Sequence, residues 1–478
     1  MRFVIIVLDG LRPDLVTPAR MPALSALMAR GARFAEARSV FPSETRVATP
    51  SLVTGCRPAA HGMVANTVFD ATLAPGRLLR TKDAGDFRIL SAGAESPLQR
   101  PTMGERLAAS GRSFAVVSAG TPGQTLVAHP AATRLGQFRW NAADLDTPDA
   151  RAAEARLGPV PPAAVPNLAR TRHAVRVLTE YVLPELHPDI ALFWSPEPDI
   201  SFHHRGLDHA DTRLAIAEAD ACVATIVAWR DAQPDAAEIG LVVLSDHGHV
   251  TGNRQIDLAA HMARDGLPAA AGGTAITVAP AGAPGIWLAD PAMAGQVVEW
   301  LGRQDWAGPV LARDPAILPG RVARLALLDA AHPRSADLVL LFAGDEAPDH
   351  FGLPGRAAYD APDVPEGGGM HGGLHRRELA TVLAFEGGPF RAGAVVHAMA
   401  DLTDVAPTLL HLLGLDLDGM DGRALSEAWD ARADSPADAV AVALPGGFVL
   451  DGGRQAGRFY PTALRRASLA AAVAPAVA

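Results

Sequence analysis

Cysteine is nearly absent from this sequence. Only Cys56 and Cys222 occur in 478 residues, and neither belongs to a C-x-x-C or zinc-ribbon spacing. A disulfide framework and a cysteine-based zinc site are therefore excluded as organising features of the fold. One disulfide between the two residues is the alternative to two buried thiols in a reducing compartment, and the thiols are the simpler interpretation.

An excess of positive charge is also missing. The chain has 42 Lys and Arg residues against 52 Asp and Glu residues, which gives a formal net charge of −10. Proteins that bind a nucleic-acid duplex need a surplus of basic side chains for the phosphate backbone, so we expect no such partner. A small anionic substrate stays compatible with this charge if bound metal ions reverse its sign locally.

No apolar run near the N-terminus is long enough to span a membrane. The run at residues 3–8 is far shorter than the roughly 20 residues that a spanning helix needs. No small-residue cleavage site follows it, and it reads as the first strand of the fold. We therefore expect a cytoplasmic protein without a membrane partner.

Material for a large core is plentiful, because 49% of the residues are hydrophobic and 20% are charged. Short, largely β-branched apolar runs are typical of strands covered on both faces, and they lie at 3–10, 113–120, 189–199, 239–248 and 379–387. Helical apolar patterns alternate with them at 21–32, 214–232 and 401–415. This alternation predicts an α/β fold with a central, mostly parallel sheet sandwiched by helices.

The texture of the sequence changes between residues 251 and 367. Gly and Pro are frequent there, and short strand patterns lie at 275–280, 285–290 and 337–344. We expect a small inserted α+β cap, so that residues 1–250 and 368–430 form a discontinuous catalytic core. Residues 431–478 are Ala-rich and weakly patterned, and we expect a C-terminal extension whose last dozen residues are an extra helix or disordered.

Acidic residues follow three of the predicted strands. Asp9 lies at the end of the first run, after FVIIVL. Asp199 ends the third run, and Asp246 with His247 lies at the end of the fourth, after GLVVLS. Ligands of open α/β sheets bind at the carboxyl ends of the strands, so we expect these side chains to meet at one edge. Asp199 and His203 are four residues apart, and a helical turn would place both on one face, where they can share a metal ion.

One further histidine lies far downstream in the stretch GGGMHGGLH at 367–375. The glycines allow close backbone approach, so His371 is a candidate third ligand beside Asp199 and His203. Taken in order along the chain, these motifs resemble the alkaline phosphatase superfamily, and most closely its nucleotide pyrophosphatase/phosphodiesterase branch. The motifs are Asp9, FPSETRVATPSLVTG around Thr45, D-x-x-x-H at 199–203, SDHG at 245–248 and HGG at 371–373.

The resemblance covers residues 1–70, 190–250 and 368–425 well and the remainder weakly. It implies an alkaline-phosphatase-like core with two metal sites. One site would be held by Asp199, His203 and His371. The other would be held by Asp9, Asp246, His247 and the hydroxyl of Thr45.

Thr45 matches the nucleophile of the family, because it stands eight residues before Val53 of the VTG segment. Asn66, which follows Thr45 by 21 residues, matches an asparagine that donates a hydrogen bond to a phosphoryl oxygen. Three histidines and three aspartates suit Zn²⁺, with Mn²⁺ or Fe as alternatives. Two dications against three carboxylates leave about one positive charge, which attracts a phosphoryl anion. We expect a hydrolase of small phosphate esters that works through a covalent phospho-threonine.

Two departures from the family pattern concern the substrate. Arg46 stands where nucleotide-cleaving relatives carry an aromatic residue, and a guanidinium suits an oxyanion or carboxylate of the substrate. Residues 119–121 are Ala, Gly and Thr, where monoesterase-like relatives place Lys or Arg. A phosphodiester is therefore favoured. The alternatives are a phosphonate or phosphomonoester hydrolase on the same site and a catalytically silent metal-binding homologue.

The stretch CRPAA at 56–60 superficially resembles the C-x-P-x-R signature of sulfatases. Ala60 replaces the arginine of that signature, and Cys56 follows the VTG segment instead of preceding it. We therefore do not expect sulfatase activity.

Overall fold

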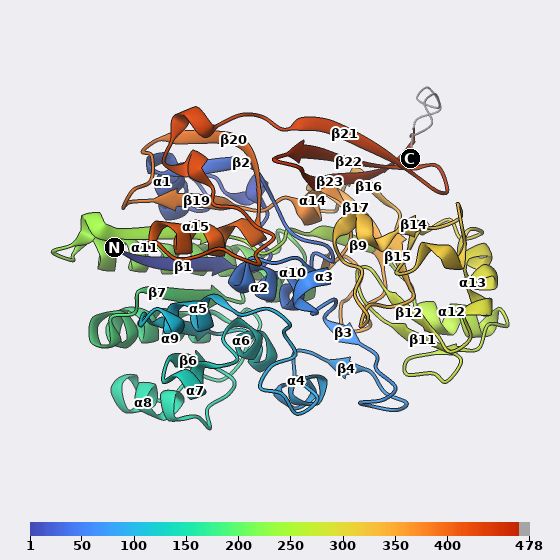
Figure 1. Ribbon diagram of the computed structural model, residues 1–478, viewed down its shortest axis with the longest axis horizontal. Helices are drawn as coiled ribbons and strands as arrows, with labels where there is room; N and C mark the ends of the chain where they lie inside the picture. Colours follow the sequence, from blue (N-terminus) through green and yellow to red (C-terminus); the bar gives the residue numbers. More distant parts are fainter. Residues whose placement is uncertain (468–478) are drawn as a thin grey trace.

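A computed structural model describes residues 1–467, and its centre is one eight-stranded sheet between two layers of helices (Figure 1). The strand order is β20-β2-β19-β8-β1-β7-β5-β6. Only β19 runs antiparallel to its neighbours, so the predicted mostly parallel α/β architecture is confirmed. The strands are β1 (Arg2–Leu8), β2 (Ala32–Arg38), β5 (Phe114–Ser118), β6 (Phe138–Asn141), β7 (Ile190–Ser195), β8 (Ile239–Leu244), β19 (Leu383–Glu386) and β20 (Ala394–Asp401).

Alternate residues of β1 fill two separate cores. Val4, Ile6 and Leu8 pack with residues of α9 and α11 on one face, while Phe3, Ile5 and Val7 pack with α2, α5 and α15 on the other. Burial on both faces explains why the strand is an unbroken apolar run. The helices are α1 (Pro22–Arg30), α2 (Thr45–Thr54), α5 (Met103–Ala109), α6 (Pro122–Ala128), α9 (Leu168–Arg176), α11 (Ala210–Asp231) and α15 (Val405–Leu412).

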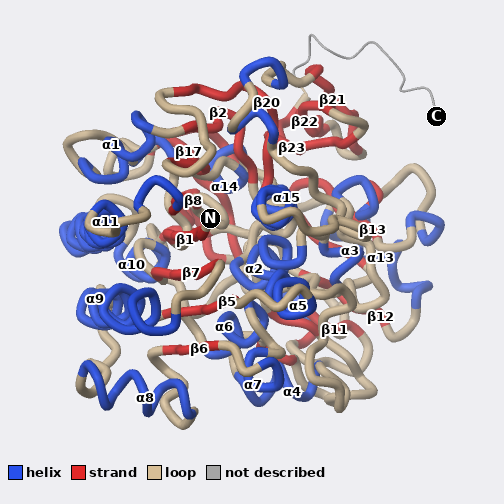
Figure 2. Tube along the Cα trace, turned by 60° about the vertical axis from the view of Figure 1, so that its left-hand side comes forward, coloured by secondary structure: helices blue, strands red, loops and turns tan. Residues whose placement is uncertain are grey.

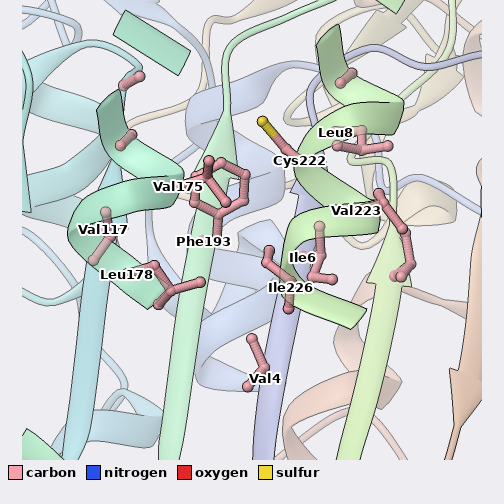
Figure 3. Close-up of a cluster of buried hydrophobic side chains, with 14 of the residues drawn as sticks. Val4, Ile6, Leu8, Val117, Val175, Leu178, Phe193, Cys222, Val223 and Ile226 are labelled. Carbon is pink, nitrogen blue, oxygen red and sulfur yellow. The ribbon is translucent and has the colours of Figure 1, made fainter. Parts of the chain in front are cut away.

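Figure 2 shows α9 and α11 on one side of the central strands and α2, α5 and α6 on the other. Figure 3 shows the first core, in which Phe193 of β7 lies beside Val175 and Cys222 from the covering helices. Both cysteines are free and buried. Within residues 1–467, we find no helix that has both the length and the apolar character to cross a membrane.

A second sheet of six strands occupies much of the predicted cap. Its order is β10-β11-β12-β15-β13-β14, and it packs its own hydrophobic cluster around residues such as Ile276, Val297 and Leu340. The cap boundaries at 251 and 367 stay a prediction. The strands are β10 (Ala269–Ala270), β11 (Ile276–Ala279), β12 (Gly285–Leu288), β13 (Ala307–Ala312), β14 (Ala323–Arg324) and β15 (Leu338–Phe342).

Two smaller sheets join this region and the C-terminal part to the core. One has the order β16-β17-β9-β18, and the other is an antiparallel meander that the Ala-rich composition did not suggest. The last residues expected to be helical or disordered lie beyond 467, outside the described part of the chain. The strands are β9 (Val250–Gln255), β16 (Gly344–Pro348), β17 (Pro354–Tyr359), β18 (Gly369–Met370), β21 (Asp438–Leu444), β22 (Phe448–Gln455) and β23 (Arg458–Arg466).

A buried charge network fastens the C-terminal sheet to the core. Arg458 of β23 donates to Asp404 and, at 3.1 Å, to Asp401. Asp401 also accepts from Arg57, which lies just beyond α2. Asp401 and Asp404 are only 2% and 0% exposed, so they depend on these guanidinium groups for compensation of their charge.

We predict that Arg458→Met lowers the free energy of unfolding by about 3–5 kcal/mol, since it leaves two buried carboxylates short of a cation. Urea unfolding followed by circular dichroism measures this loss. The matched control is Arg432→Met, because the Arg432 side chain is 92% exposed and pairs with Asp430 at the surface. An unfolding midpoint shifted equally little by both substitutions would contradict the prediction.

Candidate active site

Three aspartates lie at the carboxyl ends of the central strands. Asp9 follows β1, Asp199 begins α10 (Asp199–Arg205) after β7, and Asp246 follows β8. Because β1 pairs in parallel with both β7 and β8, the three segments leave the sheet at the same edge. The N–H of Asp199 donates to the carbonyl oxygen of Asp9 at 3.1 Å. The structure therefore brings together the strand ends that the sequence singled out.

Asp199, His203 and His371 form a first cluster. Asp199 and His203 lie one turn apart on α10, and Nε2 of His203 is 3.2 Å from Oδ1 of Asp199. The glycine-rich loop brings Nε2 of His371 to 3.2 Å from Nε2 of His203 and 3.6 Å from Oδ1 of Asp199. Three residues predicted to share one metal ion thus meet in space.

Asp9, Asp246 and His247 form a second cluster beside the first. Nε2 of His247 lies 3.5 Å from Oδ1 of Asp9 and 3.4 Å from Oδ2 of Asp246. Oγ1 of Thr45 lies 3.3 Å from the same Nε2 atom. The rings of His247 and His371 stack with centroids 3.7 Å apart, so the two clusters lie directly beside each other.

Backbone carbonyl oxygens fix how the three histidine rings are oriented. Each Nδ1 faces a carbonyl oxygen, which can only accept, so Nδ1 carries the proton of the neutral ring. Each Nε2 therefore directs its lone pair into the cluster, as in histidines that bind metals. The Nδ1 to oxygen distances are 2.7 Å from His203 to Gly369, 2.8 Å from His371 to Ser43 and 3.1 Å from His247 to Gly248.

Two of the carboxylates, those of Asp9 and Asp246, are held in a similar manner, with one oxygen accepting hydrogen bonds and the other left without a partner among the described residues. Oδ2 of Asp9 accepts from the indole N–H of Trp194 at 2.8 Å, and Oδ1 of Asp246 accepts from the N–H of Gly10 at 3.0 Å. Oδ1 of Asp9, Oδ2 of Asp246 and Oδ1 of Asp199 are buried without a hydrogen-bond partner among the described residues. Buried acceptors that face one another are costly unless a cation compensates them, so this donor set fits divalent metal ions such as Zn²⁺.

Burial shapes the pKa values of these groups. Burial, with repulsion from Asp246 and Asp199, raises the pKa of Asp9 well above its usual range. Burial also raises the pKa of Asp246 to about 7 and lowers the pKa of His247 to about 3. His247 is therefore neutral, which is the form that binds metals, whereas Asp9 and Asp246 retain protons more strongly than usual, and a bound cation would displace these protons.

Thr45 stands apart from the neighbouring hydroxyl residues. It is the first residue of α2, and its Oγ1 faces His247. The other three hydroxyls donate to backbone carbonyl oxygens: Ser43 to Gly373 at 3.0 Å, Thr49 to Thr45 at 2.7 Å and Ser51 to Val47 at 2.8 Å. Of the hydroxyls of Ser43, Thr45, Thr49 and Ser51, only that of Thr45 lies against the second cluster, where it contacts His247.

Asn66 and Arg46 are joined at the start of α2. Oδ1 of Asn66 accepts from the backbone N–H of Arg46 at 3.1 Å, which leaves the side-chain NH₂ group of Asn66 as the end available to a ligand. The Arg46 side chain is half-buried, and its Nε has no hydrogen-bond partner among the described residues. Burial lowers the pKa of Arg46, while Glu44, Asp9 and Asp199 act to raise it.

Two residues of the site escaped the sequence analysis. His249 joins the clusters, since ligand atoms of Asp199, His247, His249 and His371 lie within 4.8 Å of one another. The sequence signal was the second histidine of the stretch SDHGH, two residues after His247. Trp194 is buried in β7 and donates its indole N–H to Asp9, and an indole within an apolar strand gives no sequence signal of such a bond.

Three other histidines near the motifs lie outside the clusters. His204 is exposed on α10. The side chain of His209 accepts from the N–H of Asp211 at the start of α11, and that of His375 accepts from the N–H of Arg377 at the start of α14 (Arg376–Leu379). These histidines shape local backbone and hold no position among the converging acceptors.

Comparisons with known proteins point to one family. The family model described as Type I phosphodiesterase / nucleotide pyrophosphatase matches residues 3–345, which is more than half of the chain. A Xenopus laevis protein described as bis(5'-adenosyl)-triphosphatase enpp4 is 37% identical over 70 residues. That alignment spans 15% of this chain and 16% of the length of the relative.

Similar solved structures cover most of the chain. Murine ectonucleotide pyrophosphatase / phosphodiesterase 5 has a TM-score of 0.64 at 17% identity, with 90% of this chain and 100% of that chain covered. The human protein of the same name has the same TM-score and coverage at 18% identity. Phosphonoacetate hydrolase from Sinorhizobium meliloti has a TM-score of 0.61 at 18% identity, covering 85% and 94% of the two chains. At these identities the likeness is one of fold.

We predict that chelation destabilises the protein more as pH rises. The folded pKa values of Asp9 and Asp246 lie above the unfolded value near 3.9, so at these two carboxyl groups the unfolded state binds fewer protons than the metal-free folded state. Its stability is then lost as pH rises through about 7, whereas bound cations would keep the ionised carboxylates compensated. The fall in melting temperature on adding EDTA should therefore be larger at pH 8 than at pH 5.5.

The measurement is differential scanning calorimetry of metal-loaded and EDTA-treated protein at each pH. Asp246→Asn is the matched control, because it removes the carboxyl group whose pKa is raised to about 7. An EDTA effect that is equal at the two pH values, or larger at pH 5.5, would contradict the prediction.

Proposed function

The chain belongs to the type I phosphodiesterase / nucleotide pyrophosphatase family and is a hydrolase of that class, and from this premise we propose that it is a two-zinc phosphodiesterase acting through Thr45. The observation that carries the proposal is the convergence of buried acceptors next to one free hydroxyl. Asp199, His203 and His371 would hold one ion. Asp9, Asp246, His247 and Oγ1 of Thr45 would hold the other, with Mn²⁺ or Fe as alternative metals.

When bound, the two ions supply positive charge that lowers the pKa of the alcohol and of water and compensates the phosphoryl oxygens. Oγ1 of Thr45 attacks phosphorus, the ester bond to the leaving group breaks in line with it, and the proton of the hydroxyl leaves with the departing alcohol. A water molecule then cleaves the bond between phosphorus and Oγ1. Its hydroxyl group goes to phosphorus and its other proton goes to Oγ1, which releases the product and restores the hydroxyl. The first turn of α2 holds the nucleophile in place, because Thr45 is its first residue.

Asn66 orients the phosphoryl group in this proposal. The side-chain Oδ1 of Asn66 accepts from the N–H of Arg46. Its backbone carbonyl oxygen accepts from both the N–H and the hydroxyl of Thr81, at 3.0 and 2.8 Å. Of the side-chain amide, only the NH₂ group is left to donate. Hydrogen bonds to the side-chain oxygen and to the backbone carbonyl of the same residue fix its direction. An amide held in this way donates to a phosphoryl oxygen without further ordering.

Arg46 is the proposed contact to a negatively charged part of the substrate. It follows the nucleophile directly, and no ion pair between its guanidinium and a carboxylate is present among the described residues. A murine structural relative was solved in complex with AMP. A guanidinium in place of an aromatic side chain makes a nucleotide base a poorer partner here than an oxyanion or carboxylate.

A phosphodiester is the favoured substrate because residues 119–121 supply no cation for a second phosphate charge. Thr121 instead caps α6 through the N–H of Gln124. Phosphonate or phosphomonoester hydrolysis is the second candidate. Two free thiols support the cytoplasmic location that is part of the proposal.

We predict that the zinc-loaded enzyme prefers bis-p-nitrophenyl phosphate to p-nitrophenyl phosphate in kcat/KM. A monoanionic diester matches a centre with about one surplus positive charge better than a dianionic monoester does. Release of p-nitrophenol from both compounds, with a phosphonate ester as third substrate, measures the preference. A higher kcat/KM for the monoester or the phosphonate would replace the diester assignment by the second candidate.

We predict that Thr45→Ala lowers kcat by at least roughly 10³-fold, because loss of the nucleophile removes the covalent route. Metal content, measured by plasma mass spectrometry, should stay near two ions per chain, since the three aspartates and three histidines remain. Thr54→Ala is the matched control, as its hydroxyl donates to the carbonyl oxygen of Pro50 at the far end of α2. Unchanged turnover in Thr45→Ala would remove Thr45 from the mechanism.

A further inference from the structure

His249 lies among the proposed metal ligands without belonging to the six that the sequence singled out. It sits between β8 and β9 and is fully buried. Its ring centroid is 5.4 Å from that of His203 and 5.1 Å from that of His371. Its Nε2 is 3.0 Å from Oδ1 of Asp199, the shortest distance that any of the histidines makes to that oxygen.

The contact between His249 and Asp199 brings two acceptors together. Nδ1 of His249 lies 2.9 Å from the carbonyl oxygen of Gly10, which can only accept, so Nδ1 carries the proton of the neutral ring. The Nε2 lone pair then faces the carboxylate oxygen. Both Nε2 of His249 and Oδ1 of Asp199 are buried without a hydrogen-bond partner among residues 1–467.

We propose that His249 is a fourth protein ligand of the metal ion held by Asp199, His203 and His371, an inference that rests on the proposed metal-dependent function. The spacing of the donor atoms supports it. Oδ1 of Asp199 is 3.0, 3.2 and 3.6 Å from Nε2 of His249, His203 and His371. Four ligands at about 2.0–2.1 Å around a tetrahedral zinc ion are separated by about 3.3 Å, within that range.

The surroundings hold the His249 ring where it is. A Cβ atom at residue 10 would lie 2.3 Å from Cε1 of His249, and one at residue 369 would lie 2.9 Å from Cδ2. Both positions are glycine, and the φ of Gly10 is +69°, which favours glycine. Phe202 packs against the ring edge-on with centroids 4.9 Å apart. The ring therefore cannot turn away from Asp199 without displacing backbone.

A fourth protein donor makes the two metal positions unequal. The Asp199 position would have four protein ligands, three of them imidazole nitrogens, whereas the Asp9 position has two carboxylates, one imidazole and the reactive hydroxyl. Closed four-ligand sites are typical of tightly held zinc, and an incoming oxygen must enter such a site as a fifth ligand. The ion at the Asp199 position should therefore be the one retained longest under chelation.

The competing account is that His249 only orients Asp199 by donating a hydrogen bond. His249→Gln separates the two accounts, because an amide can still donate to the carboxylate but is a poor zinc ligand. Zinc affinity is measured by competition with a chromophoric chelator, with His204→Ala, the exposed histidine on α10, as matched control. We expect His249→Gln to lose at least about 10- to 100-fold in affinity for one ion and His204→Ala to bind as the wild type does. Unchanged affinity in His249→Gln would overturn the proposal.

A second measurement does not depend on how His249→Gln folds. The Asp246→Asn variant with one zinc ion per chain is studied by X-ray absorption, which counts imidazole ligands. Three imidazoles support the proposal, and two overturn it. The metal content of the wild-type protein distinguishes this proposal from the proposed two-metal function. If the wild type binds a single ion and His249→Gln loses it, the four-ligand site is supported and the two-metal mechanism is overturned. A wild type without bound ions overturns both.

Discussion

The active edge of this protein depends on acceptors that face one another in its interior. Several buried acceptor atoms converge there: oxygens of Asp9, Asp199 and Asp246 and the Nε2 atoms of His203, His247, His249 and His371. Among residues 1–467, Asp9 Oδ1, Asp199 Oδ1, Asp246 Oδ2 and His249 Nε2 have no hydrogen-bond partner. Burying such groups without compensation costs several kcal/mol for each charge. Metal cations can compensate all of these acceptors together. The geometry therefore indicates a cation-binding site before it indicates any catalytic role.

Backbone and side-chain donors away from the cluster make this convergence possible. Each histidine ring is fixed by a hydrogen bond from Nδ1 to a carbonyl oxygen, and Asp9 is fixed by Trp194. The loop that carries His371 is fixed by Glu378, which accepts from the N–H groups of Gly373 at 3.0 Å and His375 at 2.9 Å. Because these partners bind the outward-facing atoms of the rings and carboxylates, the Nε2 atoms and the remaining carboxylate oxygens point into the cluster. The tautomer of each histidine and the orientation of the ligands are therefore set before any ion arrives.

The sequence allowed the sheet and much of the cluster to be predicted for one physical reason. Strands β1, β7 and β8 are buried on both faces, so they read as largely apolar runs, and each is followed within a few residues by an aspartate of the site, Asp9, Asp199 or Asp246. Strand β2 was not predicted, because ARFAEAR mixes charged with apolar residues beside the edge strand of the sheet. The strands β21 to β23 were hidden in Ala-rich sequence. His249 was missed because its role depends on Gly10, 239 residues away, which a local pattern does not reveal.

Charge balance decides what the cluster can accept. In the proposed mechanism, two dications and three carboxylates would leave about one positive charge, which would match the single charge of a phosphodiester. Arg46 would add another positive charge beside the proposed nucleophile Thr45, and no carboxylate is paired with it among the described residues. The positive charge of Arg46 would bind best to a substrate that carries a second anionic group outside the phosphoryl centre, because the metal ions would already compensate the charge of the phosphate. Under this proposal, Arg46 would select for negative charge on the leaving group or on the retained group of the substrate, where an aromatic side chain would select for a flat ring.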